Sequence, residues 1–287
     1  MIALATFFTV ALVCLGLAAA AAFAYGSYRW RRGTLDMRRL LEAGRIPVLP
    51  ARVDFAQLAG LPAPVQRYLR RVLTDGAPMV ATVQLQHIGT MNLRENSPRW
   101  SAFTSDQQVV TGRPGFDWDA RISMLPGVTA LVHDAYINGE GRLRASLYGL
   151  ITVASLRGTE EMARGELLRF LAEAVWYPTV LLPGQGVSWD AVDAQSARAT
   201  LTDGAVAASL RFLFGDDGLV VGVHAEARGR TLGATTIPTP WHGRFWRYEQ
   251  TQGMLVPQCG EVGWMLESGL SLYWKGEIAT AQYRFAC

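Results

Sequence analysis

The sequence contains only three cysteines in 287 residues, too few for a disulfide framework. Cys14 lies in an apolar N-terminal segment, and Cys259 and Cys287 can pair only if their strands are neighbours, which the sequence leaves open. Histidine is also scarce, and its spacing is not that of zinc ligands. The four histidines are His87, His133, His224 and His242. We therefore expect no metal site and no cofactor.

The short motifs of several enzyme classes are missing as well. No Gly-x-Ser-x-Gly nucleophile elbow, phosphate-cradling glycine loop or dinucleotide fingerprint occurs. The formal net charge is only +3, which differs from the dense basic surface of a nucleic-acid-binding protein. These absences argue against a nucleic-acid partner and leave any reaction without a sequence signature.

No charged side chain occurs between Met1 and Tyr25. About 20 apolar residues cross a bilayer as a helix, so this run predicts a transmembrane anchor, which we assign to residues 1–28. A signal peptide begins with a basic region, which this sequence lacks, although Ala22–Ala24 (Ala-Phe-Ala) resembles a cleavage site. Cleavage stays open, and an uncleaved single span is the preferred interpretation.

Basic residues follow the apolar run closely, and none precedes it: Arg29, Arg31, Arg32, Arg38 and Arg39. The positive-inside rule then favours the cytoplasmic side of the cell membrane for the C-terminal part, and the opposite side stays open. Residues 29–78 are expected to form a helical juxtamembrane or linker region. Within it, the helix Val65–Leu73 has an apolar face at helical spacing and an arginine-rich opposite face.

From Met79 onward the hydrophobic pattern changes from helical to alternating, and about ten short strands are expected. Turn signals separate them, at Asn138-Gly139, Asp203-Gly204 and Gln252-Gly253. Consecutive hairpins imply an antiparallel sheet, and a sheet of this length tends to curl. We expect a mostly β, α+β fold over residues 79–287, a strongly curved half-barrel with helices packed on its concave face.

One helix, predicted at residues 160–176, interrupts the strands. Thr159 is a suitable N-cap, and Arg169 lies between Glu166 and Glu173 at spacings that allow ion pairs along the helix surface. Packing on the sheet is the leading interpretation of this helix. The wall or lid of an apolar ligand cavity is the second, and a catalytic role is the third.

The candidate ligand-binding residues are the apolar and aromatic side chains of this helix and of the segment around the Pro-Trp dipeptide. They are Leu167, Phe170, Leu171, Trp176, Tyr177, Trp241 and Trp246. The candidate polar site consists of Arg164, Glu166, Arg169 and Asp190. Catalysis by two carboxylates would require a pair of them to face one cleft, and spacing alone does not establish such a pair.

Four stretches carry a resemblance to a known family: RGELLRFLAEAVWYPTVLLP from Arg164, VSWDAVD from Val187, TPWHGRFWRYEQTQGMLVPQ from Thr239 and YWKGEIATAQY from Tyr273. With them, the chain after the anchor resembles a family of uncharacterised bacterial membrane-anchored proteins, the domain of unknown function DUF6544. The strand-rich layout is also similar in topology to the lipoprotein carriers LolA and LppX. Those half-barrels shelter acyl chains on the concave face, and the resemblance implies no catalytic residues.

Three functions remain open at this point. The first is a membrane-tethered binding module for an apolar or lipid-like ligand, whose partners are the bilayer and that ligand. The second is an enzyme acting on a cell-envelope or membrane substrate. The third is a structural partner of another membrane protein.

Overall fold

In the computed structural model, the residues described are 2–93, 99–232 and 235–286. Within them, thirteen strands form one antiparallel sheet, three more than the alternating pattern suggested. The strands are β1 (Val80–Met91), β2 (Ser101–Val110), β3 (Gly115–Leu125), β4 (Val128–Ile137), β5 (Glu140–Leu147), β6 (Ile151–Arg157), β7 (Val187–Asp193), β8 (Ser196–Asp203), β9 (Val206–Phe214), β10 (Val220–Leu232), β11 (Thr235–Thr251), β12 (Met254–Leu266) and β13 (Gly269–Phe285).

The spatial order of the strands is β6-β5-β4-β3-β2-β1-β13-β12-β11-β10-β9-β8-β7. Each half of the chain is therefore a meander, and the halves join where β1 pairs with β13. The expected turns close the hairpins. Asn138 and Gly139 have φ of 55° and 86°, and Gln252 and Gly253 have φ of 47° and 87°. Two consecutive residues with positive φ are typical of the tight turns that suit twisted antiparallel strands.

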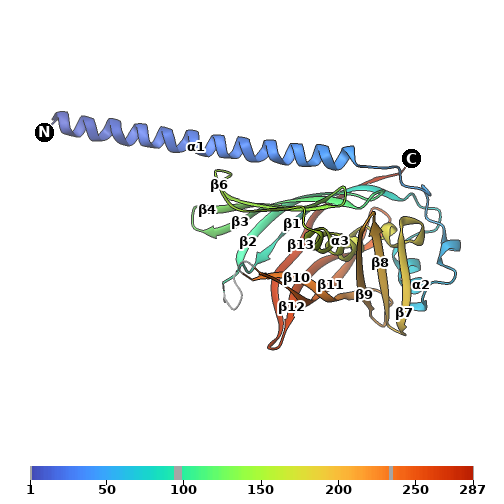
Figure 1. Ribbon diagram of the computed structural model, residues 1–287. Helices are drawn as coiled ribbons and strands as arrows, with labels where there is room; N and C mark the ends of the chain where they lie inside the picture. The colour runs from blue at the N-terminus through green and yellow to red at the C-terminus, as the bar shows by residue number, and fades with distance from the viewer. Residues whose placement is uncertain (1, 94–98, 233–234, 287) are drawn as a thin grey trace.

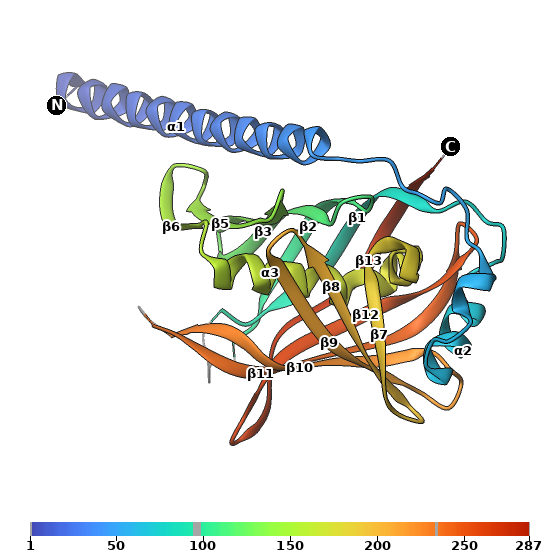
Figure 2. The ribbon, with the colours of Figure 1, turned by 45° about the vertical axis from the view of Figure 1, so that its right-hand side comes forward.

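Helix α3 (Glu160–Glu173) connects β6 to β7, the two edges of the sheet. It packs against β3, β4 and β5 on one side and against β9 and β10 on the other. Because α3 touches strands from both ends of the sheet, the sheet curves around it, as Figure 2 shows. This arrangement is the expected curved antiparallel sheet with a helix on its concave face.

The N-terminus of α3 is capped as predicted, since the Thr159 hydroxyl accepts a hydrogen bond from the Met162 amide at 3.2 Å. Three short 3-10 helices follow α3 at Ala174–Trp176, Pro178–Leu181 and Pro183–Gln185. Two tyrosine hydroxyls hold this connection: Tyr177 donates to the Phe170 carbonyl at 2.9 Å, and Tyr283 donates to the Trp176 carbonyl at 2.7 Å.

Helix α1 (Ile2–Ala43) is one continuous helix that contains both the apolar run and the basic segment after it. Its C-terminal part packs on β2, β3 and β4 on the face of the sheet opposite to α3 (Figure 1). The long N-terminal helix, which the sequence analysis expected separately from the helix on the concave face, thus lies on the outer face of the sheet. The side chains of β3 alternate between the two faces: Trp118 points toward α3, and Asp117 and Asp119 point toward α1.

The N-terminal part of α1 projects beyond the body of the protein, and its side chains from Leu4 to Tyr25 are exposed. Among the described residues, one helix is long and apolar enough to cross a membrane, and it is this one, with a mean hydropathy of 2.3 in its most apolar window. By length and composition, the helix fits a membrane span or a signal sequence.

Helix α2 (Ala63–Val72) closes the end of the body formed by β8 and β12, after a short 3-10 helix at Phe55–Leu58. The predicted apolar face is confirmed, because the side chains of Val65, Tyr68, Leu69 and Val72 are buried. Cys259 is buried and has a free thiol. Its predicted partner Cys287 lies outside the described residues, so the structure does not test whether the two cysteines pair.

Candidate ligand cavity

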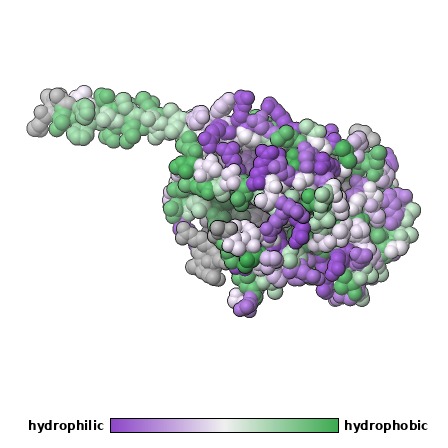
Figure 3. Space-filling model, in the orientation of Figure 1, coloured by the Kyte–Doolittle hydropathy of each residue, from purple (hydrophilic) through white to green (hydrophobic). Residues whose placement is uncertain are grey.

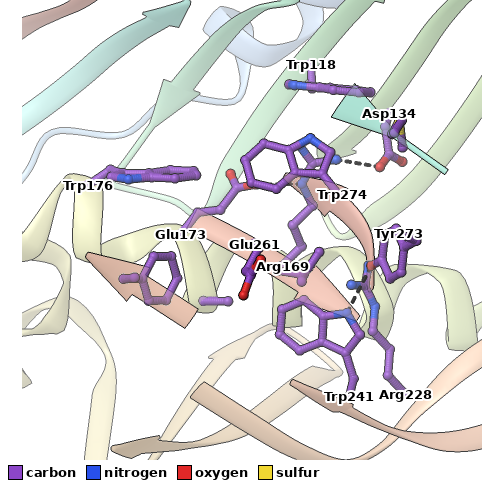
Figure 4. Close-up of a pocket in the computed structure, with 14 residues that line it drawn as sticks. Trp118, Asp134, Arg169, Glu173, Trp176, Arg228, Trp241, Glu261, Tyr273 and Trp274 are labelled. Atoms are coloured by element: carbon purple, nitrogen blue, oxygen red, sulfur yellow. Dashed lines mark hydrogen bonds and ion pairs between the residues drawn. The ribbon is translucent and has the colours of Figure 1, made fainter. Parts of the chain in front are cut away.

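A cavity of about 100 Å³ lies between α3 and the strands that face it. Six aromatic side chains line it, from three strands and from the turn after α3: Trp118, Trp176, Trp241, Phe245, Tyr273 and Trp274. Five charged side chains complete the lining: Asp134, Arg169, Glu173, Arg228 and Glu261. Figure 4 shows the tryptophans arranged around the charged groups. The cavity is thus an aromatic enclosure with ionised groups set into its wall.

Ring contacts hold the aromatic wall in place. The Trp176 ring centroid lies 6.5 Å from that of Trp274 and 6.1 Å from that of Phe245, the second pair being edge to face. His87 lies behind Trp176, with the ring centroids 5.1 Å apart. Such tilted and edge-to-face pairs are the favoured arrangements of aromatic rings and stabilise a fixed cavity shape.

Arg169 of α3 is the central cation of the cavity wall. Its guanidinium lies 2.5 Å from Asp134 Oδ2 on β4 and 2.7 Å from Glu173 Oε1 one helical turn later. The same group lies over the Trp118 ring, 5.0 Å from its centroid. The ion pair with Glu173 that the helical spacing allows is therefore present, and it lies in the cavity wall.

Glu166, one turn before Arg169, is buried, and its Oε2 has no hydrogen-bond partner in the described part of the chain. Its Oε1 lies 3.7 Å from the Arg228 guanidinium. Burial raises the pKa of this carboxyl to about 8, and the nearby Asp134 charge adds to the shift. Burial therefore favours the protonated form of this carboxyl and weakens its ion pair with Arg228.

Arg228 and Glu261 come from strands on the other side of the cavity. The Arg228 guanidinium lies over the Trp241 ring, 5.1 Å from its centroid, and the Trp241 Nε1 donates a hydrogen bond to the Tyr273 hydroxyl at 2.9 Å. Glu261 forms ion pairs with Arg244 and, at 3.9 Å, with Lys275. The two cations that line the cavity thus both lie against indole rings, an arrangement that favours a charge beside an apolar surface.

His87 contributes no charge to this region. Burial, together with the positive charge of Arg169, lowers the pKa of its imidazole to about 3. The ring Nδ1 lies 3.3 Å from the Ser105 hydroxyl. A neutral imidazole therefore supports Trp176 from behind at ordinary pH.

The predicted ligand-binding residues divide into three groups in the structure. Trp176 and Trp241 line the cavity. The apolar core behind it contains Leu167, Phe170, Leu171 and Tyr177, all of them buried. The Trp246 side chain is exposed on β11. The apolar stripe of the helix therefore forms the core, and the aromatic lining of the cavity comes from Trp176, just after the helix, and from strand residues such as Trp241.

The predicted polar residues are also separated. Arg169 lines the cavity, and Glu166 is buried next to Arg228. Arg164 lines a different, open hollow with residues of β8, β9 and β10, and Asp190 is exposed on the edge strand β7. The sequence reasoning missed Asp134, Arg228 and Glu261, which come from strands far apart in the sequence and bear no common motif.

The fold and the cavity define a class of protein: a curved antiparallel sheet that holds an aromatic cavity beneath the helix crossing its concave side. The chain belongs to a family of unknown function (DUF6920), whose model matches residues 59–283. The resemblance to DUF6544 is therefore wrong in the family number. The expectation that the chain belongs to an uncharacterised family is confirmed.

No curated protein matches the sequence. Among solved structures, the crystal structure of a LolA superfamily protein from Nitrosomonas europaea aligns with a TM-score of 0.43 and 8% sequence identity. The alignment covers 77% of this chain and 92% of that chain. A likeness at this level says nothing about what the present chain binds.

Proposed function

We propose that this protein is a membrane-tethered binding module for an apolar or lipid-like ligand. The observation that carries the proposal is the aromatic cavity between α3 and the sheet, with its six aromatic side chains. Pockets of this kind, mostly apolar with a few convergent polar groups, are typical small-molecule sites. The charged groups of the wall would orient the polar end of such a ligand.

The size of the cavity restricts the mode of binding. A volume of about 100 Å³ is equivalent to about three water molecules and lies below the usual range for drug-sized ligands. One end of a lipid-like ligand fits this space, whereas a whole lipid requires α3 or the surrounding strands to move. The proposal therefore places one end of the ligand in the aromatic enclosure.

The tether in this proposal is the apolar part of α1, with the anchor at residues 1–28 and residues 29–78 connecting it to the β domain at 79–287. The apolar run carries no charge and is followed by five arginines, which favours a cytoplasmic position for the β domain. A C-terminal reporter that is active on only one side of the membrane tests this orientation.

The ligand is tested by native mass spectrometry and organic extraction of the full-length protein purified in detergent. We expect a co-purifying hydrophobic molecule, and its loss from the variant Val262→Phe, which fills the cavity from β12. Val221→Phe adds the same volume at an exposed position of β10 and should retain the molecule. An empty wild-type protein in repeated preparations contradicts the proposal.

A second candidate is an enzyme acting on a membrane or cell-envelope substrate, and one observation favours it. Glu166 is a buried carboxyl with a raised pKa and an unpartnered oxygen next to the cavity, a combination found at catalytic acids. Glu166→Gln should then abolish a cellular phenotype of the gene without loss of folding. Asp190→Asn, at an exposed carboxylate, is the matched control, and an unchanged phenotype in Glu166→Gln counts against catalysis.

A further inference from the structure

The docked part of α1 runs along the outer face of the sheet between two hairpin turns. At one end, a side chain on Gly26 would clash with the carbonyl oxygen of Tyr148, so the helix backbone lies directly against the β5–β6 turn. At the other end, Gly44 lies equally close to Asn138 in the β4–β5 turn. The β5–β6 turn therefore lies at the end of the body from which the apolar part of α1 departs.

This turn also touches the apolar run itself. The rings of Phe23 and Tyr148 lie edge to face with their centroids 6.1 Å apart. Phe23 belongs to the charge-free segment, and the first charge after it is Arg29. Tyr25 and Tyr28 are exposed on the same stretch of helix, where interfacial aromatic residues occur in membrane proteins. Tyr148 therefore lies at the level where a bilayer around α1 would end.

The same end of the body exposes large apolar side chains. Leu125 at the β3–β4 turn is 51% exposed, and Ile151 and Val153 at the start of β6 are 62% and 56% exposed. The two turns are joined by the hydrogen bond between the Tyr148 hydroxyl and the Gly127 carbonyl. In Figure 3, hydrophobic residues gather at this end of the body, next to the base of the projecting helix. An exposed apolar patch at one place on a folded domain marks an interaction surface.

We infer that the β3–β4 and β5–β6 turns, with Leu125, Ile151 and Val153, insert into the interface of the membrane that α1 spans. The occupant of this patch is the bilayer, because the patch is continuous with the apolar helix that leaves the body beside it. Arg31 and Arg32 are exposed just past the same level on α1, where basic residues meet lipid headgroups. The inference rests on the anchor in the proposed function and adds a second contact, which orients the β domain on the membrane surface.

The test uses the full chain with its three cysteines replaced and one new cysteine introduced for a fluorescent label. The labelled positions are Leu125 and Ile151 in the patch, Phe7 in the apolar run and Val192, an exposed residue of β7. Strand β7 lies at the opposite end of the body in Figure 1. Each variant is reconstituted in phosphatidylcholine–phosphatidylglycerol vesicles that contain a lipid with a nitroxide on its acyl chain. We expect quenching at positions 7, 125 and 151 at least twofold stronger than at position 192.

The outcomes separate the inference from the anchor on which it depends. If position 7 is quenched but positions 125 and 151 are quenched no more than position 192, the turns do not contact the membrane and the inference is overturned. The anchor in the proposed function is supported in that case. An unquenched label at position 7 overturns the anchor and the inference together. Cross-linking between two copies through position 125 without lipid quenching assigns the patch to a second copy and also overturns the inference.

Discussion

Trp30, in the C-terminal part of α1, donates a hydrogen bond from its Nε1 to Oδ1 of Asp119 on β3 at 2.9 Å. The Trp30 ring also stacks on His133 of β4, with the centroids 4.6 Å apart. The hydroxyl of Thr34, one turn later, lies 2.9 Å from Nε2 of His133. The other ring nitrogen of His133, Nδ1, lies 2.8 Å from Oδ1 of Asp117. Asp117 is 0% exposed and Asp119 is 5% exposed, so α1 covers carboxylates that the alternation of β3 would leave in water.

Trp30→Phe should loosen the docking of α1, because it removes the donor to a buried carboxylate and retains the ring. The expected loss is about 1–3 kcal/mol of stability, the cost of leaving such an acceptor without its partner. Hydrogen exchange of residues 26–43 and of β3 in detergent should rise. Tyr28→Phe on the exposed side of the same helix is the control and should change stability by less than about 0.5 kcal/mol. Equal exchange in the two variants would contradict a docking role for Trp30.

Glu166→Gln should stabilise the protein increasingly as the pH rises. The folded-state pKa of about 8 lies above the ordinary 4.5, so the stability that this carboxyl contributes is complete below pH 4.5 and is lost as the pH rises toward 8. Within that window the wild-type protein should lose about 1.4 kcal/mol of its free energy of unfolding for each pH unit. The variant should not show this loss, because glutamine does not titrate. Thermal melts from pH 4.5 to 8 should show the Tm advantage of the variant growing with pH. A constant difference would mean that the carboxyl keeps an ordinary pKa.

His87→Gln should remove the loss of stability that the wild-type protein undergoes below pH 6.5. The folded-state pKa of about 3 lies below the ordinary 6.5, so stability is complete above pH 6.5 and decreases as the pH falls toward 3. At pH 5 the cost is about 2 kcal/mol. In thermal melts, the Tm advantage of the wild type over the variant should therefore become smaller from pH 7 to pH 5. His224→Gln changes a partly buried imidazole and should leave most of the dependence of Tm on pH that the wild type shows. If both substitutions have the same effect, the loss of stability at low pH does not come from His87.

Thr159→Ala should destabilise the protein by about 1 kcal/mol, because it removes the side chain that caps the first turn of α3. Chemical unfolding of the full chain in detergent measures this loss. Thr159→Ser keeps the hydroxyl and should restore most of it. If serine is no better than alanine, the hydroxyl does not cap the helix.

Several features followed from the sequence because they depend on near neighbours in the chain. The apolar face of α2, the cap at Thr159 and the turn at Asn138-Gly139 are properties of a few consecutive residues. The antiparallel, curved sheet followed from the succession of hairpins. The long apolar helix followed from the absence of charge before Arg29.

The cavity did not follow from the sequence in the same way. Its wall combines Trp118 of β3, Asp134 of β4, Arg228 of β10 and Trp274 of β13, which the chain separates by up to more than half its length. The charged stripe of α3 has the spacing of a solvent-exposed helix face, and only the wrapping of both ends of the sheet around α3 turns Arg169 inward. No local pattern indicates this wrapping.

By itself, therefore, the sequence determined the elements of this protein, their hairpin connections and the apolar helix, because backbone preference and side-chain periodicity act over a few residues. Only the tertiary structure decided that α1 covers the outer face of β2–β4, that Asp117 and Asp119 are buried, and that Arg169 lies in the cavity wall. The reason is physical: burial of a side chain depends on which distant segment lies over it, and the closure of the sheet brings those segments together.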